Sequence, residues 1–307
     1  VYVTCNTLPR EDELASLPGY LEFLQDAEAD ALIIADIGVL ELAKKYAPKV
    51  AKHISTQFGV INSAAANALY ALGADTVVLA RETPLEDIKK IRRNTPPELR
   101  LEAFVHGAMC VSFSGRCLLS NYLTGRDANR GQCAQPCRWK YHLVEEKRPG
   151  EYFEISEDGG THIMNSRDMC MIEHIPELID AGIDSFKIEG RMKSSYYAAV
   201  VTNAYHHAID AAVTGAPLDP LWVEEVNKVS HRPYTTGFYF GEPGQYYHDA
   251  TYFTDADVAA VVEDCDADGN AVLYQRNKFY RGDELELLTT DACLLYTSPS
   301  PRDKRQS

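Results

Sequence analysis

Residues 75–107 read DTVVLARETPLEDIKKIRRNTPPELRLEAFVHG. This stretch contains an apolar run at 75–81, an amphipathic helical pattern at 85–94 and a second apolar run at 99–107. Strand-like runs that alternate with a helix of this length are typical of a βαβ unit, in which the two strands pair in parallel. The stretch therefore predicts a parallel sheet with a crossover helix.

The same alternation extends to both sides of this unit. Apolar runs recur about every 20–30 residues, the length of one βα unit, and helical patterns lie between them. No GxGxxG follows any of these runs, which favours a barrel over a doubly wound dinucleotide fold. We therefore predict an α/β fold, a TIM-type (β/α) barrel that is N-terminally truncated. The other predicted strands are 1–7, 29–36, 52–58, 161–166 and 183–190, and a long helix is predicted at 194–215.

Two changes in residue composition and pattern along the chain predict the domain organisation. An insertion rich in Gly, Cys, Arg and aromatic residues interrupts the alternation at 108–160. Further along, alternating residues around a DG turn in AVVEDCDADGNAVLYQ predict a β-hairpin. We therefore predict a partial (β/α) barrel at 1–245, a small truncated β-domain at 250–292 and an artefactual or disordered tail at 293–307.

Composition and charge limit the classes of protein. The chain has 307 residues, 45% of them hydrophobic, and a net charge of −15. No apolar run approaches the roughly 18–20 residues that span a bilayer, and the first residues do not resemble a signal peptide, so we expect a cytoplasmic protein without a membrane helix. The acidic average does not indicate a nucleic-acid-binding protein. Residues 107–150, however, hold seven Lys and Arg against three acidic residues.

Five of the eight cysteines lie within residues 110–170, with the spacing Cys-x6-Cys-x15-Cys-x3-Cys-x32-Cys. In a barrel, the loops that follow the strands form the working face, so these cysteines can reach one end of the barrel. Widely spaced thiolates suit an iron–sulfur cluster, while a zinc site or buried or reactive thiols remain open. The five are Cys110, Cys117, Cys133, Cys137 and Cys170.

The segment EAFVHGAMCVSFSGRCLLS (102–120) resembles the signature of peptidase family U32, the collagenase-like peptidases. The blocks NYLTGRDANRGQCAQPCRWKY, NSRDMC, KIEGRMKS and SHRPYTTGFYFG are also similar to that family. Within the signature, the positions that match are Glu102, Phe104, Gly107, Cys110, Gly115, Cys117 and Ser120.

The resemblance implies an enzyme, but one whose reaction is not proteolysis. It implies an RNA hydroxylase with a 4Fe–4S cluster that takes the hydroxyl group from prephenate and forms 5-hydroxyuridine at the tRNA wobble position. An rRNA cytidine hydroxylase and a collagenase-like peptidase are the alternatives. No HExxH helix or GxSxG elbow supports proteolysis. The resemblance assigns the cluster to Cys110, Cys117, Cys133 and Cys170, with Cys137 as an alternative ligand.

Charged residues at the carboxyl end of a barrel strand indicate catalysis or substrate binding, and a histidine beside the cysteine loop could move a proton. A buried ion pair or a hydrogen-bonded packing residue is the structural alternative at each position. The predicted catalytic residues are Glu102, His106, Lys187, Glu189 and Arg191.

The arginines of the insertion could offset the negative charge of a cluster, or bind prephenate carboxylates or RNA phosphates. Trp139, among basic residues, could stack on an unpaired base. A solvated loop is the alternative for all of them. The predicted substrate-binding residues are Arg116, Arg126, Arg130, Arg138 and Trp139.

Overall fold

The computed structural model describes residues 1–139, 143–144, 152–153, 166–244, 246, 252, 254, 256–280, 282–290 and 293–297. The chain divides into two compact units. The first unit consists of Val1–Glu189 and His231–Tyr252, and the second of Gly190–Ser230 and Phe253–Ser307. Each unit is made of two segments, and the segments of the two units alternate along the chain. The predicted domains instead follow one another in sequence, and their boundaries stay a prediction.

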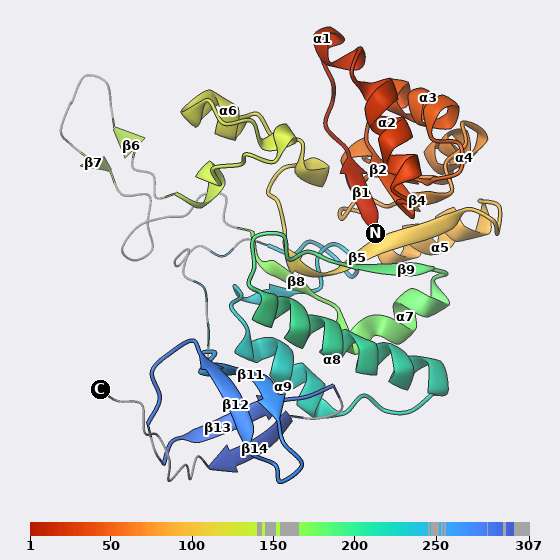
Figure 1. Cartoon of the computed structure of the whole chain (residues 1–307). Coiled ribbons are helices and arrows are strands. Elements are labelled where there is room, and N and C mark those ends of the chain that lie inside the picture. Colours follow the sequence, from red (N-terminus) through yellow and green to blue (C-terminus); the bar gives the residue numbers. More distant parts are fainter. Residues whose placement is uncertain are drawn as a thin grey trace. The chain divides into compact units, whose positions relative to one another are not determined.

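The first unit is built on a largely parallel sheet with helices between its strands. The strands β1 to β5 pair in parallel in the order in which they occur along the chain (Figure 1). The unit β4–α5–β5 is the βαβ unit predicted from residues 75–107, so the predicted α/β class with a parallel sheet is confirmed. The strands are β1 (Tyr2–Cys5), β2 (Ala31–Ile34), β3 (Ala51–Ile54), β4 (Thr76–Val78) and β5 (Arg100–Ala108).

The crossover helices between β1 and β5 share one face of the sheet. Neighbouring parallel strands that follow chain order need crossovers of the same hand, which place their helices on the same side. Leu21, Leu40 and Ile88, one from each of three helices, are fully buried, as the amphipathic patterns require. The helices of the first unit are α1 (Glu11–Leu14), α2 (Leu17–Asp26), α3 (Ile37–Tyr46), α4 (Ser63–Ala71), α5 (Leu85–Arg93), α6 (Leu119–Thr124) and α7 (Ile175–Asp180).

The far edge of the sheet departs from a simple βα series. β9 (Ser185–Ile188) pairs in parallel with β5, while β8 (Asp168–Cys170) pairs antiparallel with the end of β5 and parallel with β10 (Tyr234–Thr235). β8 follows the insertion rather than a crossover helix, so nothing imposes a parallel direction on it. Among the described residues no pairing returns to β1, so a closed barrel is not observed.

The insertion is only partly described. Its short strands β6 (Leu143–Val144) and β7 (Tyr152–Phe153) pair antiparallel. Of the strand predicted at 161–166, residues 161–165 lie outside the described residues. The 3-10 turns of the first unit are η1 (Thr56–Phe58), η2 (Phe113–Gly115), η3 (Ala128–Arg130), η4 (Pro136–Arg138) and η5 (Ile172–His174).

The second unit contains the long helix α8 (Ser195–Thr214), as predicted, and the shorter helix α9 (Pro220–Lys228). The Ser194 hydroxyl accepts the N–H of Tyr197 at the start of α8, and Gly215 ends it in the left-handed region. In the described part of the chain, every helix is too short or too polar to cross a bilayer.

Two antiparallel hairpins complete the second unit. β11 (Ala260–Cys265) pairs with β12 (Ala271–Gln275) around the predicted DG turn, and β13 (Glu284–Leu288) pairs with β14 (Cys293–Thr297). β14 opens the segment that we predicted to be a tail, and residues 298–307 lie outside the described residues.

Replacement of Asp36 by alanine is expected to lower the free energy of unfolding by about 1 kcal/mol, since the N-cap of α3 is lost. The Asp36 carboxylate accepts the N–H of Val39 at 3.0 Å. Urea unfolding followed by circular dichroism measures the change. Glu41→Ala, on the same helix, removes only an exposed ion pair with Lys44 and should cost less than about 0.5 kcal/mol. Equal losses in the two variants would contradict the capping role.

Candidate functional site

Four cysteine thiols of the insertion lie in one neighbourhood at the carboxyl end of β5. All four are half-buried and free. Burial raises the pKa of the Cys110 thiol, and the nearby thiols of Cys117 and Cys133 act in the same direction. Burial likewise raises the pKa of Cys137, with the same three thiols contributing. The structure therefore brings Cys110, Cys117, Cys133 and Cys137 within electrostatic reach of one another.

Three of these thiols share a local backbone geometry. The N–H of Ser112 donates to Sγ of Cys110 at 3.4 Å. The N–H of Leu119 donates to Cys117 and that of Gln135 to Cys133, each at 3.3 Å. In each case the donor is the second residue after the cysteine. Each of these three sulfurs therefore has a backbone N–H directed at it, and hydrogen bonds of this kind are also made to the sulfur ligands of iron–sulfur clusters.

The arrangement of these donors differs from that of a site for a single metal ion. Among the described residues, no three His, Cys, Asp or Glu side chains converge closely enough to hold a single metal ion. The cysteines that coordinate a 4Fe–4S cluster bind different iron atoms on different sides of the cluster. Their sulfur atoms therefore lie further apart than those that coordinate a single metal ion. Cysteine sulfurs that accept backbone N–H bonds are the type of ligand that a 4Fe–4S cluster takes.

Cys170 lies beside β5, ahead of the cysteine loop. It ends β8, where its Cα lies opposite that of His106 in the antiparallel pairing with β5. His106 is buried, and the Tyr234 hydroxyl lies 3.4 Å from its Nε2. The Cα of Cys170 thus lies opposite a residue of β5 that precedes Cys110 by four positions, and Asp168 lies opposite Ala108 at the end of the strand.

A carboxylate holds the loop between Cys110 and Cys117. Ser114 is buried and has a φ of 48°, in the left-handed region that serine rarely adopts. Both its N–H and its hydroxyl donate to Glu82, at 2.8 and 3.1 Å. Glu82 follows β4, so this contact ties the cysteine loop to the carboxyl end of the sheet and positions both thiols.

The arrangement of β5 and β9 depends on a glycine at the start of the loop. Gly107 has a φ of 110°, and a Cβ there would overlap the carbonyl oxygen of Glu189. Only glycine permits both the φ and the close approach. The N–H of Glu189 also donates to the carbonyl oxygen of His106 at 2.9 Å, so the ends of both strands lie together.

The predicted catalytic residues do not form one cluster in the described structure. Glu102 is buried, and its carboxylate accepts bonds from Lys187 at 2.6 Å and from Ser185 at 2.9 Å. This pair lies on one face of the sheet, part-way along the strands. Glu189 lies nearer the thiols and forms an ion pair at 3.8 Å with Arg81. Arg191 lies in the second unit, and its role stays a prediction.

The predicted substrate-binding residues also differ in their surroundings. Arg130 forms two bonds with Glu13, at 2.7 and 2.8 Å. Arg138 donates to the Gln135 side chain at 2.8 Å and to the Tyr252 hydroxyl at 2.9 Å. Both therefore have structural bonds. Arg116, Arg126 and Trp139 are exposed.

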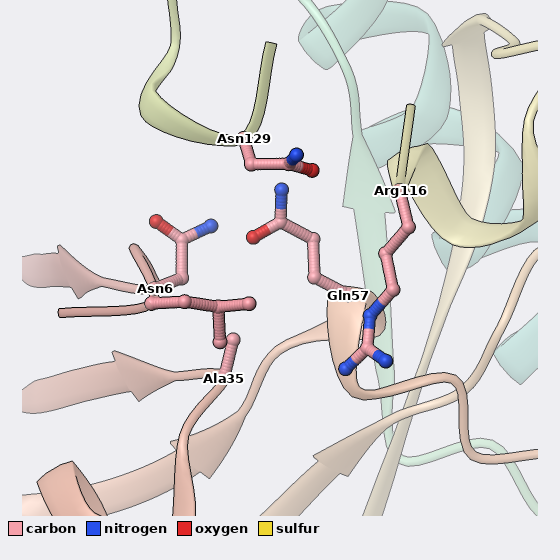
Figure 2. Close-up of a pocket in the computed structure, with 6 residues that line it drawn as sticks. Asn6, Ala35, Gln57, Arg116 and Asn129 are labelled. Atoms are coloured by element: carbon pink, nitrogen blue, oxygen red, sulfur yellow. The ribbon is translucent and has the colours of Figure 1, made fainter. Parts of the chain in front are cut away.

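A small polar pocket joins the insertion to the first three strands. Asn6 follows β1, Ala35 follows β2 and Gln57 lies just after β3. Figure 2 shows the side-chain amides of Asn6, Gln57 and Asn129 pointing toward one another, with Arg116 beside Gln57. The volume is about 10 Å³, which is room for one water molecule, so this pocket anchors the insertion rather than admitting a substrate.

A larger cavity of about 370 Å³ lies against Cys110. Its apolar wall includes Met109, Phe113 and Phe238, and its charged residues are Glu82 and Arg167. A cavity of this volume, mostly apolar with a few polar groups, is typical of a small-molecule site. The thiol neighbourhood thus borders a cavity with a mostly apolar wall.

The family model described as Peptidase family U32 matches residues 1–249. The chain belongs to this family. A Bacillus subtilis (strain 168) protein named tRNA hydroxylation protein P1 is 39% identical over 293 residues, which cover 93% of this chain and 69% of that protein. A Methanocaldococcus jannaschii protein named as an uncharacterized protease is 45% identical over 245 residues, 78% of this chain and 59% of that protein.

A third relative of this chain comes from Escherichia coli (strain K12). It is named as a 23S rRNA 5-hydroxycytidine synthase and is 34% identical over 247 residues, 78% of this chain and 36% of that protein. The chain thus spans between 36% and 69% of the length of these three relatives.

Sequence reasoning does not single out several residues of this U32 chain that the structure places at the site. Glu82 holds the cysteine loop and Arg167 lines the cavity. His53 is buried on the same sheet face as Glu102, and burial lowers its pKa. A signal existed only for Arg167, which lies in the family-like block NSRDMC.

Proposed function

We propose that this chain carries the catalytic site of an RNA hydroxylase that modifies uridine at the tRNA wobble position, in the cytoplasm. The thiol neighbourhood with three directed N–H donors is the observation that carries this proposal. The name of the Bacillus relative, which aligns with 93% of the chain, supports tRNA as the substrate. The proposal includes prephenate as the hydroxyl donor, as the family resemblance implies.

Cys110, Cys117 and Cys133 would hold a 4Fe–4S cluster, with Cys170 as fourth ligand and Cys137 as its alternative. When bound, such a cluster supplies one-electron redox chemistry. The chain's own backbone N–H groups donate to the three sulfurs, and Glu82 fixes the loop between the first two. The electrostatic reach of Cys137 supports the alternative, while the pairing of β8 with β5 supports Cys170.

We propose further that the sheet of the first unit belongs to a TIM-type barrel. The strand order and the helices on one face support this fold. In such a barrel the reaction takes place at the carboxyl ends of the strands, where the thiols and the cavity lie. Glu189 and His106 are then the predicted catalytic residues closest to the chemistry, and Glu102 with Lys187 form an ion pair deeper in the sheet.

RNA would be bound by the exposed basic part of the insertion. Arg116, Arg126 and Trp139 expose the charged and aromatic groups that phosphates and unpaired bases require. Arg130 and Arg138 would act mainly by fixing the insertion, because their guanidinium groups already have partners. This division gives the insertion two roles, one in binding and one in structure.

Nucleoside mass spectrometry tests the function. Cells that lack the full-length gene are expected to lose 5-hydroxyuridine from tRNA, and a plasmid copy should restore it. Unchanged hydroxyuridine together with lost 5-hydroxycytidine in rRNA would contradict the tRNA assignment and favour the rRNA alternative. If neither nucleoside changes and the purified protein cleaves collagen, the hydroxylase proposal is wrong.

A further inference from the structure

The cavity beside Cys110 is lined by an arginine that has one buried donor without a partner among the described residues. Arg167 lines this cavity, and its Nε is buried without a hydrogen-bond partner in the described structure. Nearly all buried donors in folded proteins are paired with protein, ligand or ordered water, so the cavity is where this N–H can find its acceptor. An anionic ligand would supply that acceptor.

Two other arginines of the first unit have carboxylate partners on the chain. Arg232 has Asp168 as its ion-pair partner, at 3.6 Å, and donates to the carbonyl oxygen of Ser166 at 2.7 Å. Arg81 pairs with Glu189 and lies over the ring of Phe104 at 3.8 Å. Arg167 thus differs from both of them in facing a cavity rather than a carboxylate of the chain.

The other charged residue of the cavity does not neutralise Arg167. Both carboxylate oxygens of Glu82 accept bonds from Ser114, at 2.8 and 3.1 Å, and this contact directs the carboxylate toward the cysteine loop. The remaining wall is largely apolar and includes Met109, Val111 and Phe238. The chamber therefore offers one cation at the edge of an apolar surface.

We propose that Arg167 binds the carboxylate of a small molecule whose apolar body packs against Phe113 and Phe238. A guanidinium group matches a carboxylate with two parallel N–H donors. The volume of about 370 Å³ suits a molecule of one ring with short substituents. An RNA phosphate fits less well, because RNA backbones are bound on open, basic surfaces rather than in apolar chambers.

This assignment rests on the proposed function, since it places the hydroxyl donor in the cavity next to the thiols. The residue is new to the site and acts on binding, so it can be tested without turnover. Isothermal titration calorimetry of the full-length protein with prephenate, with inorganic phosphate and with tRNA separates the possible anions. Arg167→Gln is expected to weaken prephenate binding at least about tenfold and to leave tRNA affinity unchanged.

Two further variants make the result interpretable. Arg167→Lys keeps the charge but not the planar fork, and should bind prephenate with intermediate affinity. Arg93→Gln, on the exposed face of α5, removes an arginine away from the cavity and should bind as the unaltered protein does. Thermal melting of all three checks that they are folded.

Three results would overturn the inference. They are equal prephenate affinity in Arg167→Gln and the unaltered protein, competition by inorganic phosphate at the same site, and a selective loss of tRNA binding. The last of these would assign Arg167 to the RNA backbone. Hydroxyuridine analysis in cells is independent of these titrations, so Arg167-dependent prephenate binding without tRNA hydroxylation would uphold this inference while contradicting the proposed function.

Discussion

Replacement of Cys110 by serine is expected to reduce tRNA 5-hydroxyuridine to background in cells whose only copy of the full-length gene carries the change. Serine has nearly the volume of cysteine, but its hydroxyl group stays protonated and is a poor ligand for iron. The N–H of Ser112, which now donates to Sγ of Cys110, would lose its thiolate acceptor. Nucleoside mass spectrometry measures the product, and colorimetric iron analysis of anaerobically purified protein measures the cluster.

The matched control is Cys265→Ser. Cys265 is an exposed free thiol on β11, in the second unit, and has no place in the proposed cluster. Its replacement should leave both iron content and hydroxyuridine unchanged. Full iron content and full hydroxyuridine in the Cys110 variant would show that the thiol neighbourhood serves another purpose.

The same assay resolves the fourth ligand. Cys137→Ser and Cys170→Ser differ in position, since Cys137 lies in η4 of the insertion and Cys170 ends β8. A four-iron cluster takes four thiolates, so only one of these two variants should lose iron to the extent that Cys110→Ser does. Loss in the Cys170 variant would agree with the ligand set that the resemblance implies.

The parallel part of the fold could be predicted because its signals are local. An apolar run, a helical pattern and a second run lie within residues 75–107, and each determines its own secondary structure. The antiparallel direction of β8 and the two-residue strand β10 could not be predicted, because both depend on pairings between residues 60 or more positions apart. Residue pattern alone does not specify such pairings.

The candidate site shows the same contrast. The cysteine cluster is visible in the sequence because five thiols within residues 110–170 are unusual in any chain. Arg167 is not visible in this way, since its role depends on a cavity whose walls come from 109–113 and 238–244. Glu82 is an ordinary surface acid in the sequence, and becomes a positioning residue only through the left-handed Ser114.

Replacement of Arg232 by methionine is expected to destabilise the protein by about 3–5 kcal/mol, a large fraction of the 5–15 kcal/mol that typically separates folded from unfolded chains. Arg232 is fully buried, and so is its partner Asp168. Methionine fills much of the same volume but leaves the Asp168 carboxylate in the interior without the opposing charge. The Arg232 side chain also donates to the Tyr252 hydroxyl at 3.0 Å, and that bond is lost as well.

Urea unfolding compares this variant with two others. Lys89→Met breaks an exposed ion pair with Glu86 on α5 and should cost no more than about 1 kcal/mol. The double variant Arg232→Met, Asp168→Asn removes both charges and should recover part of the loss. A cost for Arg232→Met as small as that of Lys89→Met would mean that the buried pair contributes little.

The position of Arg232 gives this prediction a functional consequence. Its contacts with Ser166 and Asp168 hold the residues on either side of Arg167. Because the backbone of Arg167 is fixed from both sides, loss of Arg232 should displace its guanidinium group from the cavity. We therefore expect Arg232→Met, at temperatures where it is still folded, to weaken prephenate binding as Arg167→Gln does. Retained affinity would show that the cavity wall keeps its shape without the buried pair.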